Sequence, residues 1–164
     1  MNCLIIYDTL YGNTEQVARA IAAAFTPGDS ARLVRADQIA ELDTGSIDLL
    51  IVGGPTHRHR MSPKIAVLLK AAPRGTLKGV KVAAFDTRYR MAAWLSGSAA
   101  SSIARYLRKL GGSLLVPPES FFIERDEPPR GEKRRHNLER LEAGENERAA
   151  RWAMGIVNII KTKS

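Results

Sequence analysis

The sequence predicts an α/β fold in which a doubly wound parallel sheet carries helices on both faces. Short apolar runs suited to strands buried on both faces alternate with stretches whose apolar residues recur at helical spacing. The first apolar run is Cys3–Tyr7, and a helical pattern from Val17 to Phe25 follows it. Because strand and helix patterns alternate in this way in β/α units, we expect the strands to be parallel.

The same alternation continues through five β/α units. The later strand candidates are Ala31–Arg35, Ile47–Gly54, Val80–Phe85, and Ser113–Val116 with Phe121–Ile123. Pro117 and Pro118 interrupt the fifth strand, and proline inside a strand indicates an edge or a bulge. The later helix candidates are Pro63–Leu69, a helix capped by Ser98 and closed by Gly111 and Gly112, and a final helix that turns Trp152, Ile156, Val157 and Ile160 inward. With 164 residues and 45% hydrophobic composition, the chain has enough apolar side chains for one substantial core. We therefore expect residues 1–164 to form a single domain.

Composition also indicates the compartment of the protein and the kinds of site that it lacks. The one cysteine, Cys3, has no partner for a disulfide, which favours a reducing compartment. No apolar run approaches the roughly 18 residues that a membrane span requires, and the first residues lead directly into a core strand. His57 and His59 are close in sequence, but no cysteine or carboxylate neighbours them at ligand spacing, so no metal site is expected. These features predict a soluble, cytoplasmic protein.

The segment between the first strand and the first helix is rich in hydroxyl and amide side chains. It reads Thr9, Leu10, Tyr11, Gly12, Asn13 and Thr14. The first backbone N–H groups of a helix have no intrahelical partners and carry partial positive charge, so an anion fits there. Thr9 and Thr14 can donate hydroxyls, and Gly12 allows a close backbone approach or a positive φ. The segment therefore predicts a phosphate-binding loop, with an ordinary helix cap as the alternative.

The loop contains no lysine, and this narrows the ligand. A triphosphate loop of the G-x-x-x-x-G-K-[ST] type uses a cation, and the dinucleotide fingerprint requires G-x-G-x-x-G. Neither pattern is present here. A neutral loop of hydroxyls and amides suits one terminal phosphate monoester, as in FMN.

The loop resembles the T-x-T-G-x-T phosphate loop of flavodoxins, with Tyr11 in place of the middle threonine. The resemblance implies a five-stranded sheet of order 2-1-3-4-5, with FMN bound where the strand order reverses, between strands 1 and 3. Two further loops should then converge on the same crevice, because ligands of open α/β sheets lie beyond the carboxyl ends of the strands.

Both loops are present. Pro55, Thr56 and His57 follow the third strand, and they match the flavodoxin loop that ends in an aromatic residue covering one flavin face. Asp86, Thr87, Arg88 and Tyr89 follow the fourth strand, and Tyr89 matches the tyrosine that stacks on the other face. His57 stands where many flavodoxins carry tryptophan, so stacking, hydrogen bonding and an exposed loop position all remain open. An alternative for Tyr89 is a core position, which would leave Arg88 or Trp94 beside the flavin.

Charge is distributed unevenly along the chain. Residues 55–112 hold twelve lysines and arginines against the single carboxylate Asp86, a net charge of +11. Residues 1–54 contribute −4 and residues 113–164 contribute +1, which brings the whole chain to +8. Flavodoxins that carry electrons are typically acidic around the flavin, so the basic segment predicts redox partner proteins with acidic surfaces. The charge-dense segment at about 125–148 predicts either a solvated loop or helical turn, or a docking arm.

Three functions are compatible with these features. The leading one is an FMN-binding electron-transfer protein without catalytic residues of its own, because the chain has no second nucleotide fingerprint and no room for a nicotinamide domain. The alternative is an FMN-dependent oxidoreductase that acts on a quinone or a porphyrinogen. A polyanion or nucleic-acid binder ranks last, because the basic segment lacks interleaved aromatic residues and a recognisable binding motif.

Overall fold

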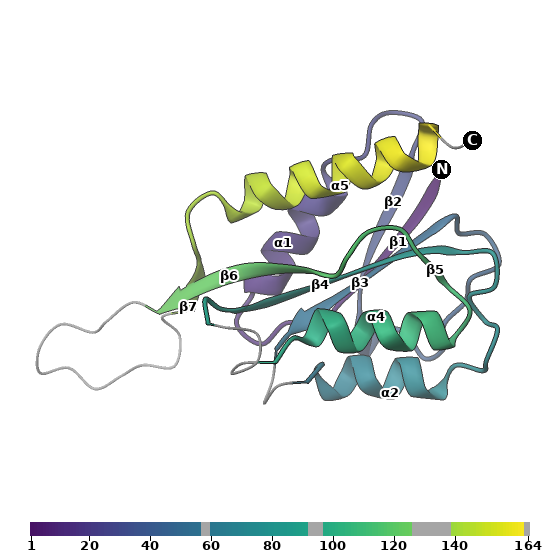
Figure 1. Ribbon diagram of the computed structural model, residues 1–164, viewed down its shortest axis with the longest axis horizontal. Coiled ribbons are helices and arrows are strands. Elements are labelled where there is room, and N and C mark those ends of the chain that lie inside the picture. Colours follow the sequence, from purple (N-terminus) through teal and green to yellow (C-terminus); the bar gives the residue numbers. More distant parts are fainter. Residues whose placement is uncertain (57–59, 92–96, 126–138, 163–164) are drawn as a thin grey trace, which may run out of the picture.

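The structure is a computed structural model that describes residues 1–56, 60–91, 97–125 and 139–162. A central sheet separates two pairs of helices, with α1 and α5 on one face and α2 and α4 on the other (Figure 1). The elements are β1 (Asn2–Tyr7), α1 (Asn13–Ala22), β2 (Ser30–Arg35), η1 (Ala36–Gln38), β3 (Leu49–Pro55), α2 (Pro63–Ala71), β4 (Lys81–Tyr89), α4 (Ala99–Lys109), β5 (Ser113–Leu114), β6 (Glu119–Arg125), β7 (Glu139–Leu141) and α5 (Glu145–Thr162).

The sheet confirms the predicted α/β fold and the predicted order of its first four strands. Its seven strands run β2-β1-β3-β4-β6-β7, and β5 pairs with the first residues of β4. All pairs are parallel except β6 with β7. The sequence predicts five strands, and the structure differs in dividing the fifth and in adding β7. Pro117 and Pro118 lie between β5 and β6, where a residue without an N–H cannot continue the ladder.

The fifth strand is predicted to form a free edge of the sheet, and in the structure that edge is covered. The last three residues of β6 pair with β7. Nearer its start, the N–H of Phe122 donates to Glu145 Oε2 at 2.7 Å, and Arg148 donates to the carbonyl of Ser120. Both side chains come from the first turn of α5. Paired or covered edges do not recruit further strands, so β7 and the start of α5 protect the outer edge of β6.

Each face of the sheet buries its own apolar cluster. On the α1 and α5 side, Phe85 and Phe121 are fully buried and meet Trp152 edge to face, with ring centroids 6.0 to 6.3 Å apart. This confirms the predicted inward position of Trp152. On the other side, apolar residues of α2 and α4 pack against β1, β3 and β4. Cys3 is buried in the first cluster, and burial raises the pKa of its thiol far above the ordinary value, which keeps it protonated.

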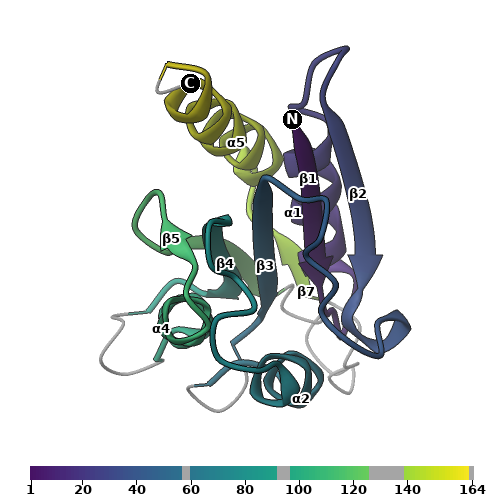
Figure 2. The ribbon, with the colours of Figure 1, turned by 90° about the vertical axis from the view of Figure 1, so that its right-hand side faces the viewer.

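The carboxyl ends of β1, β3 and β4 lie side by side, as Figure 2 shows. Each of these strands is followed along the chain by a helix, so the predicted site residues that the structure describes gather at one edge of the sheet. The charged segment at 125–148 contains β7 and the first turn of α5, and its residues 126–138 lie outside the described part of the chain.

Candidate functional site

The loop between β1 and α1 leaves the N-terminus of the helix open. Gly12 has a φ of 88°, in the left-handed region, and its N–H donates to Thr9 Oγ1 at 2.9 Å. Within the described residues, no side chain caps α1, and a Cβ added at Gly12 would meet no heavy atom within 4 Å apart from its chain neighbours. Open space therefore lies against an uncapped helix N-terminus, where an anion is favoured by the free N–H groups and by the helix dipole. This geometry fits the predicted phosphate loop.

The side chains of the loop divide into two groups. Leu10 and Tyr11 are exposed, at 66% and 43%, so their side chains face solvent. Asn13 and Thr14 are buried. The Thr14 hydroxyl lies 2.7 Å from the hydroxyl of Thr87 on β4, which ties the loop to the neighbouring predicted loop. Because such a pair uses only one of its two protons, one hydroxyl keeps a proton that it can donate elsewhere.

The residues predicted to form the loop after the fourth strand, Asp86 to Tyr89, belong to β4 itself, and the backbone at the end of β3 is bonded to them. The N–H of Thr56 donates to the carbonyl of Thr87 at 3.0 Å, and Pro55 is the last residue of β3. The structure thus brings Thr14, Thr56 and Thr87 together, as the resemblance implies. His57 lies outside the described residues, as does Trp94, so the roles given to them stay predictions.

Asp86 is buried on the α4 side of the sheet and serves the start of that helix. Its Oδ2 accepts hydrogen bonds from Thr56 Oγ1 at 3.0 Å, Ser98 Oγ at 2.8 Å and the N–H of Ala100 at 2.9 Å. The predicted Ser98 cap is confirmed, because its hydroxyl also accepts from the N–H of Ser101. The Asp86 carboxylate therefore ties the start of α4 to β4 and to Thr56, and its place among the cofactor-binding residues stays a prediction.

Arg88 and Arg90 follow on β4 and just beyond it, and both are held by protein groups. Arg88 Nε donates to Ser120 Oγ at 3.0 Å, and its Nη1 donates to the carbonyl of Met91 at 2.8 Å. Arg90 forms an ion pair with Glu142 at 2.6 Å. Both guanidinium groups lie over the ring of Phe122, at 5.4 and 4.1 Å from its centroid.

Tyr89 is half-buried at the end of β4 rather than turned into the core. Its hydroxyl donates to the carboxylate of Glu139 on β7 and accepts from Arg125 Nη2 at 3.0 Å. The guanidinium of Arg125 lies 5.2 Å from the ring centroid. Burial and the Glu139 carboxylate raise the pKa of Tyr89 above its ordinary value. The contacts of Arg125 and Glu139 with Tyr89 could not be predicted from the sequence, because the two residues stand at the ends of a charge-dense run without periodicity.

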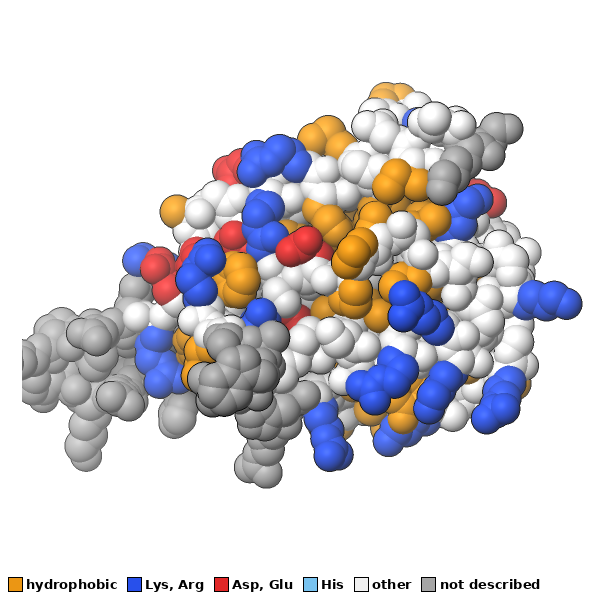
Figure 3. All heavy atoms as spheres, viewed as in Figure 1, with side chains coloured by type: hydrophobic (Ala, Val, Ile, Leu, Met, Phe, Trp, Pro, Cys, Tyr) orange, Lys and Arg blue, Asp and Glu red, His pale blue; other side chains and the backbone are white. Residues whose placement is uncertain are grey.

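The positive charge of residues 55–112 is divided between the two ends of the sheet. At the carboxyl edge stand Arg88 and Arg90, which contact carboxylates, Lys64, which pairs with Asp37, and the exposed Arg60. The cations at the opposite edge have no ion pair within the described residues: Lys70, Arg74, Lys78, Lys81, Arg108 and Lys109. Figure 3 shows Lys and Arg side chains gathered over the α2 and α4 layer with no acidic side chain among them in this view. The basic surface thus lies largely away from the candidate site.

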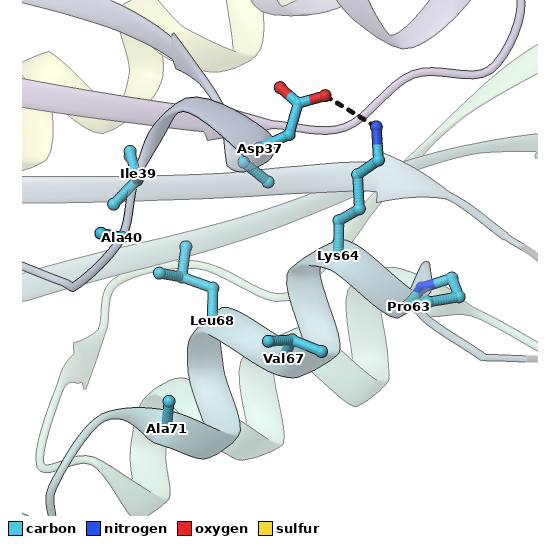
Figure 4. A pocket seen from close by; sticks show the side chains of 9 residues that line it. Asp37, Ile39, Ala40, Pro63, Lys64, Val67, Leu68 and Ala71 are labelled. Carbon is cyan, nitrogen blue, oxygen red and sulfur yellow. Dashed lines mark hydrogen bonds and ion pairs between the residues drawn. The ribbon is translucent and has the colours of Figure 1, made fainter.

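A groove of about 290 Å³ lies between η1 and α2 (Figure 4). Its lining is mostly apolar and includes Ile39, Val67 and Leu68. Its two charged side chains, Asp37 and Lys64, bind one another at 2.7 Å. Neither is free to orient a polar ligand, and none of the predicted site residues lines the groove.

Two other kinds of site are absent from the described ranges. No group of three His, Cys, Asp or Glu side chains within them is placed to hold a metal ion. Among the described helices, none is long and apolar enough to cross a membrane.

Fold and loop geometry define a flavodoxin-like α/β protein. The family model described as flavodoxin domain matches residues 4–109, so the chain belongs to the flavodoxin domain family. No curated protein matches the chain significantly in sequence.

Solved structures share the fold over nearly the whole chain. Oxidised flavodoxin 1 from Bacillus cereus has a TM-score of 0.75 at 17% identity, with 96% of this chain and 98% of that one covered. A flavodoxin from the domain Archaea has a TM-score of 0.70 at 17% identity, with 98% and 99% covered. Rubredoxin oxygen:oxidoreductase from Desulfovibrio gigas has a TM-score of 0.66 at 18% identity, and the match covers 99% of this chain but 36% of that larger one. At these identities the comparisons establish the fold.

Proposed function

We propose that this protein binds FMN at the carboxyl edge of its sheet and carries electrons between partner proteins. The observation that carries the proposal is the uncapped N-terminus of α1, which faces open space at Gly12 within a loop of hydroxyls. Membership of the flavodoxin domain family supports a flavin-dependent electron-transfer role. The phosphate of FMN is the part of the cofactor that this loop would select.

The residues present fit a phosphate monoester. The first N–H groups of α1 and the hydroxyls of Thr9 and Thr14 supply donors, and the loop carries no carboxylate side chain to repel an anion. The acidic residues that flank the loop in sequence are engaged elsewhere, since Asp8 lies 3.7 Å from Lys64 and Glu15 pairs with Arg19. The bound flavin would supply the electron chemistry, while the protein supplies binding, orientation and electrostatics.

The partner proteins in this proposal have acidic surfaces and approach the carboxyl edge. Electron transfer requires the donor to come close to the flavin, and the loops that would hold it lie at that edge. Most cations there are already paired, so the attraction comes from the total charge of +8 and from exposed groups such as Arg60.

Comparison of FMN with riboflavin tests the cofactor, because riboflavin lacks the phosphate. The wild type should bind FMN at least about tenfold more tightly, since one hydrogen bond to a charged group contributes about 1.5–3 kcal/mol. Equal affinities, measured by quenching of flavin fluorescence, would contradict the phosphate loop.

Gly12→Ala and Gly28→Ala form a matched pair for the same assay. Both glycines have a positive φ, 88° and 96°, and a Cβ at either would meet none of the described neighbouring residues within 4 Å, so the backbone strain is alike. Only Gly12 borders the loop. Gly12→Ala should therefore reduce the preference for FMN over riboflavin, and Gly28→Ala should leave it unchanged.

Steady-state kinetics separates the carrier from an enzyme. A carrier loaded with FMN should show negligible oxidation of a reduced nicotinamide in the presence of a quinone. Sustained turnover would favour the oxidoreductase that acts on a quinone or porphyrinogen instead.

A further inference from the structure

Glu139, the first residue of β7, contacts both halves of the candidate site. Its backbone carbonyl accepts a hydrogen bond from Asn13 Nδ2 at 3.1 Å, and Asn13 opens α1 beside the phosphate loop. Its carboxylate accepts a hydrogen bond from the hydroxyl of Tyr89, the residue expected to stack on the flavin. Glu139 therefore links the phosphate loop to Tyr89 at the end of β4.

Arg125, the last residue of β6, also contacts both Tyr89 and Glu139. It is the register partner of Glu139 in the β6 and β7 pair, and the two side chains form an ion pair at 3.5 Å. Arg125 also donates to the Tyr89 hydroxyl, at 3.2 Å from Nε and 3.0 Å from Nη2, and its guanidinium lies over the ring. Arg125 and Glu139 therefore both hold Tyr89 at its hydroxyl end.

We propose that Glu139 is a positioning residue of the FMN site: its carboxylate holds Tyr89 in the orientation that stacks on the flavin, while its backbone holds Asn13. The inference rests on the proposed function. A tyrosine whose hydroxyl is anchored at two points loses less rotational freedom when a ligand stacks on it, and such preorganisation increases affinity. Asn13 Oδ1 is buried and has no hydrogen-bond partner among the described residues, so the contact with the Glu139 carbonyl is the one that orients this side chain.

The contact itself is tested on the apoprotein by alkaline titration of tyrosine absorbance. The signal of Tyr89 is identified by its loss in Tyr89→Phe. In Glu139→Gln, Tyr89 should ionise at a lower pH than in the wild type, because a hydrogen-bonded carboxylate no longer opposes the phenolate charge. An unchanged titration would show that the contact is absent and would overturn the inference without any use of FMN.

The role in binding is tested by titrating the same apoproteins with FMN and following flavin fluorescence. Glu139→Gln should weaken FMN binding about threefold to tenfold, the effect of one additional side chain that must be ordered on binding. It should also reduce the quenching at saturation, which reports the stacking of the tyrosine. Glu139→Asp keeps the negative charge, but its shorter side chain cannot reach the Tyr89 hydroxyl. It should therefore weaken FMN binding as Glu139→Gln does, which would show that the hydrogen bond and not the charge is required.

Two controls decide whether Glu139 acts through Tyr89. In a Tyr89→Phe background, Glu139→Gln should have little further effect, and a full additional loss would overturn the inference. Glu142→Gln removes a neighbouring carboxylate that pairs with Arg90, and it should leave FMN affinity unchanged. A loss equal to that of Glu139→Gln would indicate a general charge effect and would also overturn the inference. If the wild type itself fails to bind FMN, the proposed function fails, while the tyrosine titration still reports on the contact.

Discussion

Replacement of Gly53 by alanine should destabilise the protein through a single side chain in the core. Gly53 lies in β3 between its register partners Tyr7 and Phe85, and a Cβ built at this position would overlap the ring of Phe85. Phe85 is fully buried, and its ring meets Phe121 at 6.0 Å and Trp152 at 6.3 Å, so it cannot move without disturbing both. Overpacking of this kind costs about 1–3 kcal/mol.

The neighbouring Gly54 provides the control in the same strand. A Cβ there would lie 3.6 Å from Ile65 Cγ1 and 3.7 Å from Ser62 Oγ, which is ordinary van der Waals contact. In a domain of this size, 1 kcal/mol shifts the midpoint of thermal unfolding by about 2–4 °C. Gly53→Ala should thus lower the midpoint by about 4–8 °C for a cost of about 2 kcal/mol, and Gly54→Ala should change it little. Equal midpoints for the two variants in thermal unfolding followed by circular dichroism would refute the reasoning.

Three further outcomes are expected. Burial alone would raise the pKa of Glu145, but hydrogen bonds from Arg148 and from the N–H of Phe122 outweigh burial and hold the pKa below its ordinary value. The ionised Glu145 therefore stabilises the fold at pH values above the unfolded-state pKa of 4.5. This stabilisation is lost as the pH falls through the folded-state pKa. Glu145→Gln should accordingly be less stable than the wild type near pH 7 in urea unfolding, and a difference that does not shrink toward acidic pH would contradict this. Asp86→Ala should cost about 1–3 kcal/mol in urea unfolding, since Thr56, Ser98 and Ala100 lose their shared acceptor, and an unchanged urea midpoint would argue against the cap. In stopped-flow measurements with an acidic donor at low salt, Arg60→Glu should slow electron transfer more than Lys109→Glu, which lies at the opposite edge of the sheet, and equal rates would exclude docking at the carboxyl edge.

The sequence predicts much of this fold because the buried strands are long, continuous apolar runs with turns between them. Ile47–Gly54 and Val80–Phe85 are both recognisable as strands from their apolar residues alone. The predicted end of the fourth strand is wrong, because the polar residues Asp86 to Tyr89 continue β4 between β3 and β6. β7 could not be predicted, because Glu139, Arg140 and Leu141 form a three-residue strand inside a run of charges. Its formation depends on pairing with β6 rather than on any pattern of its own.

The candidate site could likewise be predicted only in part, because some of its contacts depend on residues distant in sequence. Hydroxyls and glycines in the sequence predict its loops, but the partners of Asp86 and Tyr89 come from residues 12 and 50 positions away in sequence. The charge of residues 55–112 is also divided by the fold, because each β/α unit crosses the molecule from one edge of the sheet to the other. Residues close in sequence, such as Lys81 and Arg88, thereby come to lie at opposite ends of one strand.

The break at Pro117 and Pro118 makes the outer side of this sheet modular. β5 is paired with Lys81 and Val82 at the start of β4, and β6 is paired with Phe85–Tyr89 at its end. The pairing of β6 with the end of β4 is therefore separate from the pairing of β5 with its start. The pair of β6 and β7, which contacts Tyr89 through Arg125 and Glu139, can in this way shift without any change of register at β5.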